Sequence, residues 1–233
     1  RLDRTRQAIA LEPQTVAPGQ SLDFFVLHSG GEPLVVQPTS LEEAQAARQA
    51  AQAYWTNAPL PWNRIEVPDA GVQALLDSSV RNIWQAREIK NDMTVFQVGP
   101  TCYRGLWIVD GAFLLEAATM LGAGDQARNG VATELTHQQA DGRIQVMANY
   151  WKENGIVLWT CVRHARLTQD KAWLESVWPK LERIAAFIQT LRRQTLSNAS
   201  PLDDGLIPPG FPDGGIGGVR VEYTNVYWNL LGL

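Results

Sequence analysis

The spacing of hydrophobic residues divides the chain into an extended N-terminal region and a longer helical region. Near the N-terminus, short apolar runs are separated by turn residues, a pattern typical of β-strands. The expected strands are Ala8–Leu11, Leu22–Leu27 and Leu34–Val36. We expect these strands to form the edge of a larger β-domain.

From Ser40 onward, hydrophobic residues recur at the spacing of amphipathic helices. Ser40 followed by Glu43 forms a capping box in front of a helix over residues 41–55. Asp69 is the expected N-cap of a second helix, which carries its apolar residues on one stripe. That stripe consists of Val72, Leu75, Leu76, Ile83 and Ala86.

More helices are predicted toward the C-terminus, at residues 110–121, 125–140, 149–167, 178–195 and from Tyr223 onward. Pro179 sets the start of the helix over residues 178–195, because proline disrupts a helix interior but fits its first turn. Short turns alternate with long loops between these helices. The long loops cover residues 91–106, 140–148 and 197–221. This alternation predicts helical hairpins arranged in a ring, with the long loops gathered on one functional face.

The composition narrows the classes of function. A net charge of -4 at pH 7 does not suit a protein that follows nucleic-acid phosphates, so no nucleic-acid partner is expected. No apolar run reaches the roughly 18 residues of a membrane span, so no membrane partner is expected either. The three histidines lack the spacing of metal ligands, and the sequence carries no cofactor motif. Nine tryptophans are an excess for a chain of 233 residues.

The first candidate cluster consists of Tyr103, Trp107 and Asp110, at the junction of a long loop and a helix. Asp110 can accept hydrogen bonds from sugar hydroxyls while Trp107 packs on the face of the sugar ring. The alternative is that Asp110 caps the helix and Trp107 fills the core.

A second cluster opens the helix over residues 149–167. Trp151 would supply a stacking surface there, and Lys152 and Glu153 would reach polar groups of a substrate. The alternative is a solvated first turn, in which the charge of Glu153 favours the positive end of the helix. Both interpretations are compatible with an acidic residue at this position.

A third cluster lies in the long loop rich in glycine and proline. Asp213 and Glu222 flank the glycines of residues 214–218, which let the backbone approach a ligand closely. Glycoside hydrolysis uses one carboxylic acid to protonate the leaving oxygen and a second carboxylate to activate water or attack carbon. Either residue is a candidate for the acid. The alternative is a loop charge at Asp213 and a helix-start charge at Glu222.

Three motifs of the helical region follow a pattern known from one enzyme family. The first runs from Tyr103 to Phe113 and is followed by Ala117 and Leu121-Gly122. The second is Asn154-Gly155 followed by Leu167-Thr168-Gln169-Asp170, and the third is Glu222-Tyr223-Thr224-Asn225 followed by Trp228 and Gly232-Leu233. Over about residues 40–233 the chain resembles the six-hairpin glycosidases, the glucoamylase-like and α-L-rhamnosidase-like enzymes with an (α/α)6 barrel.

The resemblance implies a mostly α fold, with part of an (α/α)6 barrel preceded by a few strands of a β-sandwich. Residues 1–39 would then be the end of an N-terminal β-domain and residues 40–69 a linker helix and loop. Residues 70–233 would be the first part of the catalytic barrel. Because the chain begins without Met and ends in an apolar stretch, we expect it to be a piece of a longer protein.

The resemblance also implies roles for single residues. Asp110 and Trp107 would line the sugar subsite, and the general acid would lie on the loop over residues 203–222. The catalytic base would come from a hairpin beyond Leu233. The family has an arginine immediately before its aspartate, where this chain has Val109, so one sugar contact is missing or supplied elsewhere.

The expected function is that of a glycoside hydrolase that cleaves an oligosaccharide or glycoside by carboxylate general acid/base catalysis, with inversion. The alternatives are a non-catalytic carbohydrate-binding protein on the same fold and an α/α-toroid polysaccharide lyase. The expected partner is a carbohydrate. Bacterial enzymes of this kind occur both in the cytoplasm and outside it, so the sequence leaves the compartment open, as it does the oligomeric state.

Overall fold

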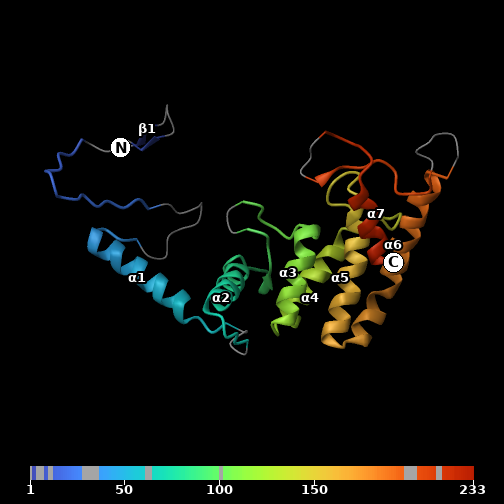
Figure 1. Ribbon diagram of the computed structural model, residues 1–233, viewed down its shortest axis with the longest axis horizontal. Helices are drawn as coiled ribbons and strands as arrows, with labels where there is room; N and C mark the ends of the chain where they lie inside the picture. The colour runs from blue at the N-terminus through green and yellow to red at the C-terminus, as the bar shows by residue number, and fades with distance from the viewer. Residues whose placement is uncertain are drawn as a thin grey trace. The chain divides into compact units, whose positions relative to one another are not determined.

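A computed structural model describes residues 2–3, 8–9, 13–27, 37–60, 65–99, 102–196, 204–213 and 217–233. The chain divides into two compact units, Arg1–Ala58 and Pro59–Leu233. Most of the described residues are helical, in agreement with the mostly α fold class predicted from the sequence (Figure 1).

Among its described residues, the first unit contains one pair of short strands and one helix. Strands β1 (Leu2–Asp3) and β2 (Ala8–Ile9) pair in antiparallel fashion. The strand expected at Leu22–Leu27 is wrong: the structure has no strand there, and every one of these side chains is exposed. An extended run becomes a strand only where a neighbouring strand completes its hydrogen bonds. The strand expected at Leu34–Val36 lies outside the described residues.

Helix α1 (Leu41–Asn57) begins where the capping pattern predicted. The Ser40 side-chain oxygen accepts a hydrogen bond from the Glu43 backbone N–H at 3.1 Å. The Glu43 carboxylate in turn accepts from the Thr39 backbone N–H at 2.7 Å. The predicted N-cap is therefore confirmed, and the returning bond of the capping box comes from Thr39.

The second unit is built around one central helix. It contains α2 (Ala70–Gln85), β3 (Glu88–Lys90), β4 (Met93–Val95), α3 (Ile108–Met120), α4 (Gly124–Thr136), α5 (Lys152–Thr168), α6 (Lys171–Gln194) and α7 (Tyr223–Gly232). Helix α5 packs against α3, α4, α6 and α7 (Figure 1). Because it has neighbours on all these sides, α5 is buried along most of its length, including the polar residues of its first turn.

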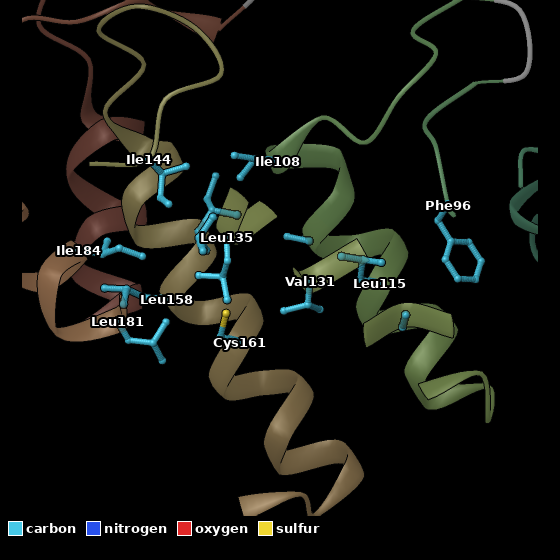
Figure 2. Packing of buried hydrophobic residues seen from close by; sticks show 14 of the residues in the cluster. Phe96, Ile108, Leu115, Val131, Leu135, Ile144, Leu158, Cys161, Leu181 and Ile184 are labelled. Carbon is cyan, nitrogen blue, oxygen red and sulfur yellow. The ribbon is translucent and has the colours of Figure 1, made fainter. Parts of the chain in front are cut away.

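The hydrophobic core lies between α3, α4, α5 and α6 (Figure 2). Its largest contributors include Phe96, Ile108, Leu115, Val131, Leu135, Ile144, Leu158, Cys161, Leu181 and Ile184. Each fully buried aliphatic or aromatic side chain contributes roughly 1.5–3 kcal/mol of transfer free energy. Cys161 belongs to this core, and burial raises the pKa of its thiol.

Helix α6 corrects the prediction that a helix starts at Trp178. It begins at Lys171, and the Asp170 carboxylate caps it by accepting from the Trp173 backbone N–H at 2.9 Å. Pro179 lies inside the helix rather than in its first turn. The apolar side chains of Trp173, Leu174 and Val177 pack against the core. This packing continues the buried face of α6 and outweighs the one backbone hydrogen bond that proline removes.

The apolar stripe of α2 is only partly buried. Asp69 caps this helix, as predicted, by accepting from the Val72 backbone N–H at 2.9 Å. Ala86 is buried and Ile83 packs against the core, whereas Val72 and Leu75 are more than half exposed. The part of the stripe near the start of the helix therefore does not face the core.

A β-hairpin lies where the sequence predicted the start of a loop. Strands β3 and β4 pair in antiparallel fashion through a turn at Asn91 and Asp92, whose φ angles are 50° and 61°. Two consecutive residues with positive φ are characteristic of the tight turns that suit a hairpin. Strands of three residues are too short to leave a clear alternating pattern in the sequence.

Helices α5 and α7 approach each other closely because glycines lie at their contact. A methyl group at Gly155 would overlap the α7 backbone at Trp228 and Asn229, and one at Gly232 would overlap the backbone of Gly155. The Asn229 side chain also donates to the Trp151 carbonyl oxygen at 3.1 Å. These contacts pack the first turn of α5 against the C-terminal half of α7.

Candidate functional site

A cavity of about 450 Å³ opens beside the first turns of α3 and α5. It is lined by Tyr103, Trp107, Ile108, Val109, Asp110, Met147, Tyr150, Glu153, Phe211 and Asp213. We call this space the carboxylate cavity, because three acidic side chains line it. Five of the site residues predicted from the sequence contribute to it: Tyr103, Trp107, Asp110, Glu153 and Asp213.

Backbone hydrogen bonds hold the long loop before α7 against the start of α5. Gly210 and Arg220 exchange two backbone hydrogen bonds, of 2.9 and 3.0 Å. The Phe211 backbone N–H donates to the Asn149 carbonyl oxygen at 2.8 Å. The rings of Phe211 and Tyr150 then meet edge to face, with centroids 5.7 Å apart. Together these contacts place Asp213 beside the first turn of α5.

Lys152 is a buried cation beside the carboxylate cavity. Its side chain is completely buried, and its Nζ lies 2.7 Å from Asp213 Oδ2 and 3.5 Å from Glu222 Oε2. The ammonium group also donates a hydrogen bond to the Thr224 hydroxyl. A buried ammonium ion is costly unless charged and polar partners surround it, and these three side chains meet that need. All three come from the last 21 residues, because the loop and α7 fold back onto α5.

Asp213 is held in its ionised form. Tyr150 donates its hydroxyl proton to Asp213 Oδ1 at 2.5 Å, opposite the oxygen that Lys152 contacts. Partial burial favours the neutral acid, but the hydrogen bonds from Lys152 and Tyr150 outweigh it and lower the pKa of Asp213 below its usual value. Glu222 also contacts Asp213, because its Oε1 accepts a hydrogen bond from the Asp213 backbone N–H at 3.2 Å.

Glu153 has the opposite electrostatic environment. It is only 2% exposed, and burial raises the pKa of its carboxyl group to about 7, although backbone N–H groups of Val146 and Met147 act to lower it. The hydrogen bond from Val146 is 2.9 Å long and holds the loop before α5. Two carboxyl groups that line one cavity therefore have pKa values shifted in opposite directions.

The aromatic side chains form the other part of the wall. Trp107 is half-buried at the N-cap position of α3, and Tyr103 meets it edge to face with centroids 6.1 Å apart. Asp110 lies in the first turn of α3 and is exposed, and the N-cap is Trp107, so Asp110 is not the N-cap that the alternative interpretation proposed. Tyr150, Phe211 and Met147 also line the cavity, and the sequence analysis did not assign them to the site. The available signal for Tyr150 was its place directly before Trp151, Lys152 and Glu153 in the sequence.

Trp151, Lys152 and Glu222 do not line the carboxylate cavity. Lys152 and Glu222 reach it indirectly, through Asp213. The Trp151 indole N–H donates to the Pro209 carbonyl oxygen at 3.2 Å, and its ring packs near Phe187. Trp151 therefore anchors the long loop, and a stacking role for it stays a prediction.

In the part of the chain that the structure describes, no three His, Cys, Asp or Glu side chains gather closely enough to hold a metal ion. None of the helices among these residues is long and apolar enough to span a membrane. No known protein family, curated protein or solved structure matches this chain.

Proposed function

We propose that this chain carries the sugar-binding and catalytic cavity of a glycoside hydrolase of the six-hairpin type. The observation that carries the proposal is the carboxylate cavity itself. One space of about 450 Å³ combines aromatic rings with two carboxyl groups whose pKa values are shifted in opposite directions. Pairs of titratable groups pushed apart in this way are typical of acid/base catalysis.

The aromatic wall suits a carbohydrate ligand. Sugar rings have apolar C–H faces and hydroxyl rims, and they pack on aromatic faces while their hydroxyls bond to carboxylates. Trp107, Tyr103 and Phe211 supply the aromatic surfaces, and the exposed carboxylate of Asp110 supplies an acceptor for hydroxyl groups.

The two shifted carboxyl groups suit different steps of hydrolysis. Glu153, with a pKa of about 7, keeps its proton below neutral pH and is the proton donor that we propose for the leaving oxygen. Asp213 is ionised and supplies the carboxylate that stabilises or activates the attacking group. This assignment moves the acid from the pair expected from the sequence, Asp213 and Glu222, to Glu153. It also gives the second carboxylate to Asp213, where the resemblance implied a base beyond Leu233. Glu222 then helps to position Asp213.

The helix arrangement supports a barrel of hairpins. Helices α3, α5 and α7 are neighbours in a row, while α4 and α6 connect them in the opposite direction (Figure 1). Helices α3 and α5 begin at the cavity, and the start of α7 reaches it through the hydrogen bond from the Thr224 hydroxyl to Asp213. A six-hairpin barrel would place its site at the same ends of its inner helices. The complete (α/α)6 barrel remains part of the proposal.

A panel of chromogenic glycosides tests the proposed function. The intact protein is expected to hydrolyse at least one member, with inversion at the anomeric carbon as seen by proton NMR of the first product. Glu153→Gln is expected to lower kcat/KM by about 10²- to 10⁴-fold for poor leaving groups and much less for activated phenols, which need no protonation. Glu175→Gln changes an exposed acid on α6 and serves as the matched control.

The other outcomes separate the alternatives. Sugar binding without turnover would indicate a carbohydrate-binding protein, and an unsaturated product would indicate a polysaccharide lyase. Equal losses for all leaving groups in Glu153→Gln would contradict its role as the acid. The same series with Glu222→Gln then decides whether the donor is Glu222.

A further inference from the structure

A second cavity of about 460 Å³ lies next to the carboxylate cavity. It is lined by Lys90, Asn91, Met93, Val95, Phe96, Arg104, Gly105, Leu106, Trp107, Gly130, Thr133, His137 and Val146. We call it the hairpin cavity, because β3, β4 and the turn between them form one of its walls. The proposed hydrolysis at the carboxylate cavity does not use it.

The two cavities are neighbours across the same two loops. Trp107 lines both of them. Its neighbours in sequence divide between the two spaces, with Leu106 in the hairpin cavity and Ile108 in the carboxylate cavity. The loop before α5 is divided in the same way, because Val146 lines the hairpin cavity and Met147 lines the carboxylate cavity. The two cavities therefore adjoin at Trp107.

The lining of the hairpin cavity suits another stretch of sugar chain. Phe96, Leu106 and Trp107 give it apolar surface, and Asn91, Thr133 and His137 place polar groups around that surface. This mixture of a mostly apolar wall with a few polar groups is typical of small-molecule sites and matches the two-sided character of a sugar ring. Its lining residues include no carboxyl group, so the chemistry of bond cleavage stays in the carboxylate cavity.

We propose that the hairpin cavity binds the continuation of an oligosaccharide whose cleaved end lies in the carboxylate cavity. The substrate class is then a chain of sugars rather than a small glycoside, and Trp107 is the surface over which the chain passes. This inference rests on the proposed glycoside hydrolase function and adds the length of its substrate. It assigns a binding role to the β3–β4 hairpin.

Two substitutions test this inference without touching the carboxylate cavity. Thr133 is exposed on α4, and Thr133→Trp would fill part of the hairpin cavity. Lys90→Ala removes a long, half-exposed side chain of β3 from the lining of the same cavity. Ala132→Trp places the same indole on a neighbouring exposed position of α4 that does not line the cavity, and it is the matched control. Circular dichroism would establish that each variant folds.

The measurement is kcat/KM for an aryl monosaccharide glycoside and for a longer oligosaccharide of the same sugar and linkage, both chosen from the positive members of the panel. Thr133→Trp is expected to lower the ratio of the oligosaccharide value to the aryl glycoside value by about tenfold, a typical effect of one lost binding contact. Lys90→Ala is also expected to lower this ratio, and Ala132→Trp is expected to leave the ratio at the wild-type value.

An unchanged ratio in both Thr133→Trp and Lys90→Ala, with the aryl glycoside still hydrolysed, would overturn the inference and leave the proposed function standing. A wild-type protein that prefers the aryl glycoside over every oligosaccharide would also overturn it. If the wild-type protein hydrolyses no glycoside at all, the proposed function itself fails, which is a distinct result.

Discussion

At the scale of single residues, Lys152 was predicted to belong to the site, but the partners of its ammonium group were not. The sequence identified Lys152 and Glu153 as site candidates at the start of a helix. The alternative of a solvated first turn is wrong, because the structure buries both side chains. The partners of Lys152 could not be predicted, since Asp213 and Glu222 lie 61 and 70 positions away in the sequence and only the fold of the loop brings them near.

Replacing Lys152 tests its control of Asp213. In Lys152→Met the ammonium group is lost, so the pKa of Asp213 is expected to rise from its lowered value. Asp213 would then become protonated at a higher pH, and the acid limb of the pH–activity profile would shift upward. Lys171→Met removes an exposed ammonium from an ion pair on α6 and is the control. An unshifted acid limb in Lys152→Met would contradict the role of this lysine.

Glu134 provides a second residue-scale test, this time of stability. It is 1% exposed on α4, and neither carboxyl oxygen has a hydrogen-bond partner among the described residues. Burial, together with the charge of Glu153, raises the pKa of Glu134 well above 4.5. A raised pKa in the folded protein favours the protonated acid, so its contribution to stability is full below about pH 4.5 and is lost as the pH rises toward the folded value.

Glu134→Gln removes this titration. The variant is therefore expected to gain stability relative to the wild type as the pH rises above about 4.5, with little difference between the two proteins at lower pH. Urea unfolding followed by circular dichroism at several pH values measures the difference. A constant gap between variant and wild type across that range would show that the pKa of Glu134 is the same in the folded and unfolded states, and would contradict the raised pKa.

At the scale of elements, the sequence predicted most helices and missed details that depend on tertiary contacts. Capping residues located the starts of α1 and α2, because Ser40 and Asp69 act through local hydrogen bonds. The predicted start of α6 was wrong because it relied on Pro179 alone. Side chains before and after Pro179 pack in the core and keep the helix continuous through it. The β3–β4 hairpin was missed because its strands are very short.

The close contact of α5 and α7 makes an element-scale prediction. Gly155→Ala would push a methyl group into the backbone of α7, which lies in rigid packing and cannot move aside cheaply. We expect this variant to lose about 1–3 kcal/mol of unfolding free energy. Gly71→Ala, near the exposed start of α2, meets only the side-chain tip of Asp69 and is the control. If urea unfolding gives Gly155→Ala the same unfolding free energy as the wild type, the close packing of α5 on α7 is contradicted.

At the scale of the whole molecule, the mostly helical fold class could be predicted from hydrophobic spacing, and the site was predicted in part. Residue types pointed to Trp107, Asp110, Glu153 and Asp213, and the structure gathers these four in one cavity. The sequence could not reveal which carboxyl groups are buried, and burial is what separates the pKa values of Glu153 and Asp213. It also could not reveal the hairpin cavity, whose walls come from segments far apart in the sequence.

The most direct test of the central claim is the fate of solvent oxygen during turnover of a sugar substrate. In water labelled with heavy oxygen, hydrolysis transfers one solvent oxygen to the anomeric carbon of the new reducing end, and mass spectrometry of the product detects it. We predict this label in the product of the intact protein and its disappearance, together with the product, in the Glu153→Gln/Asp213→Asn double variant. Product without solvent oxygen, or full labelling in the double variant, would contradict the assignment of the carboxylate cavity as a glycoside-hydrolysing site.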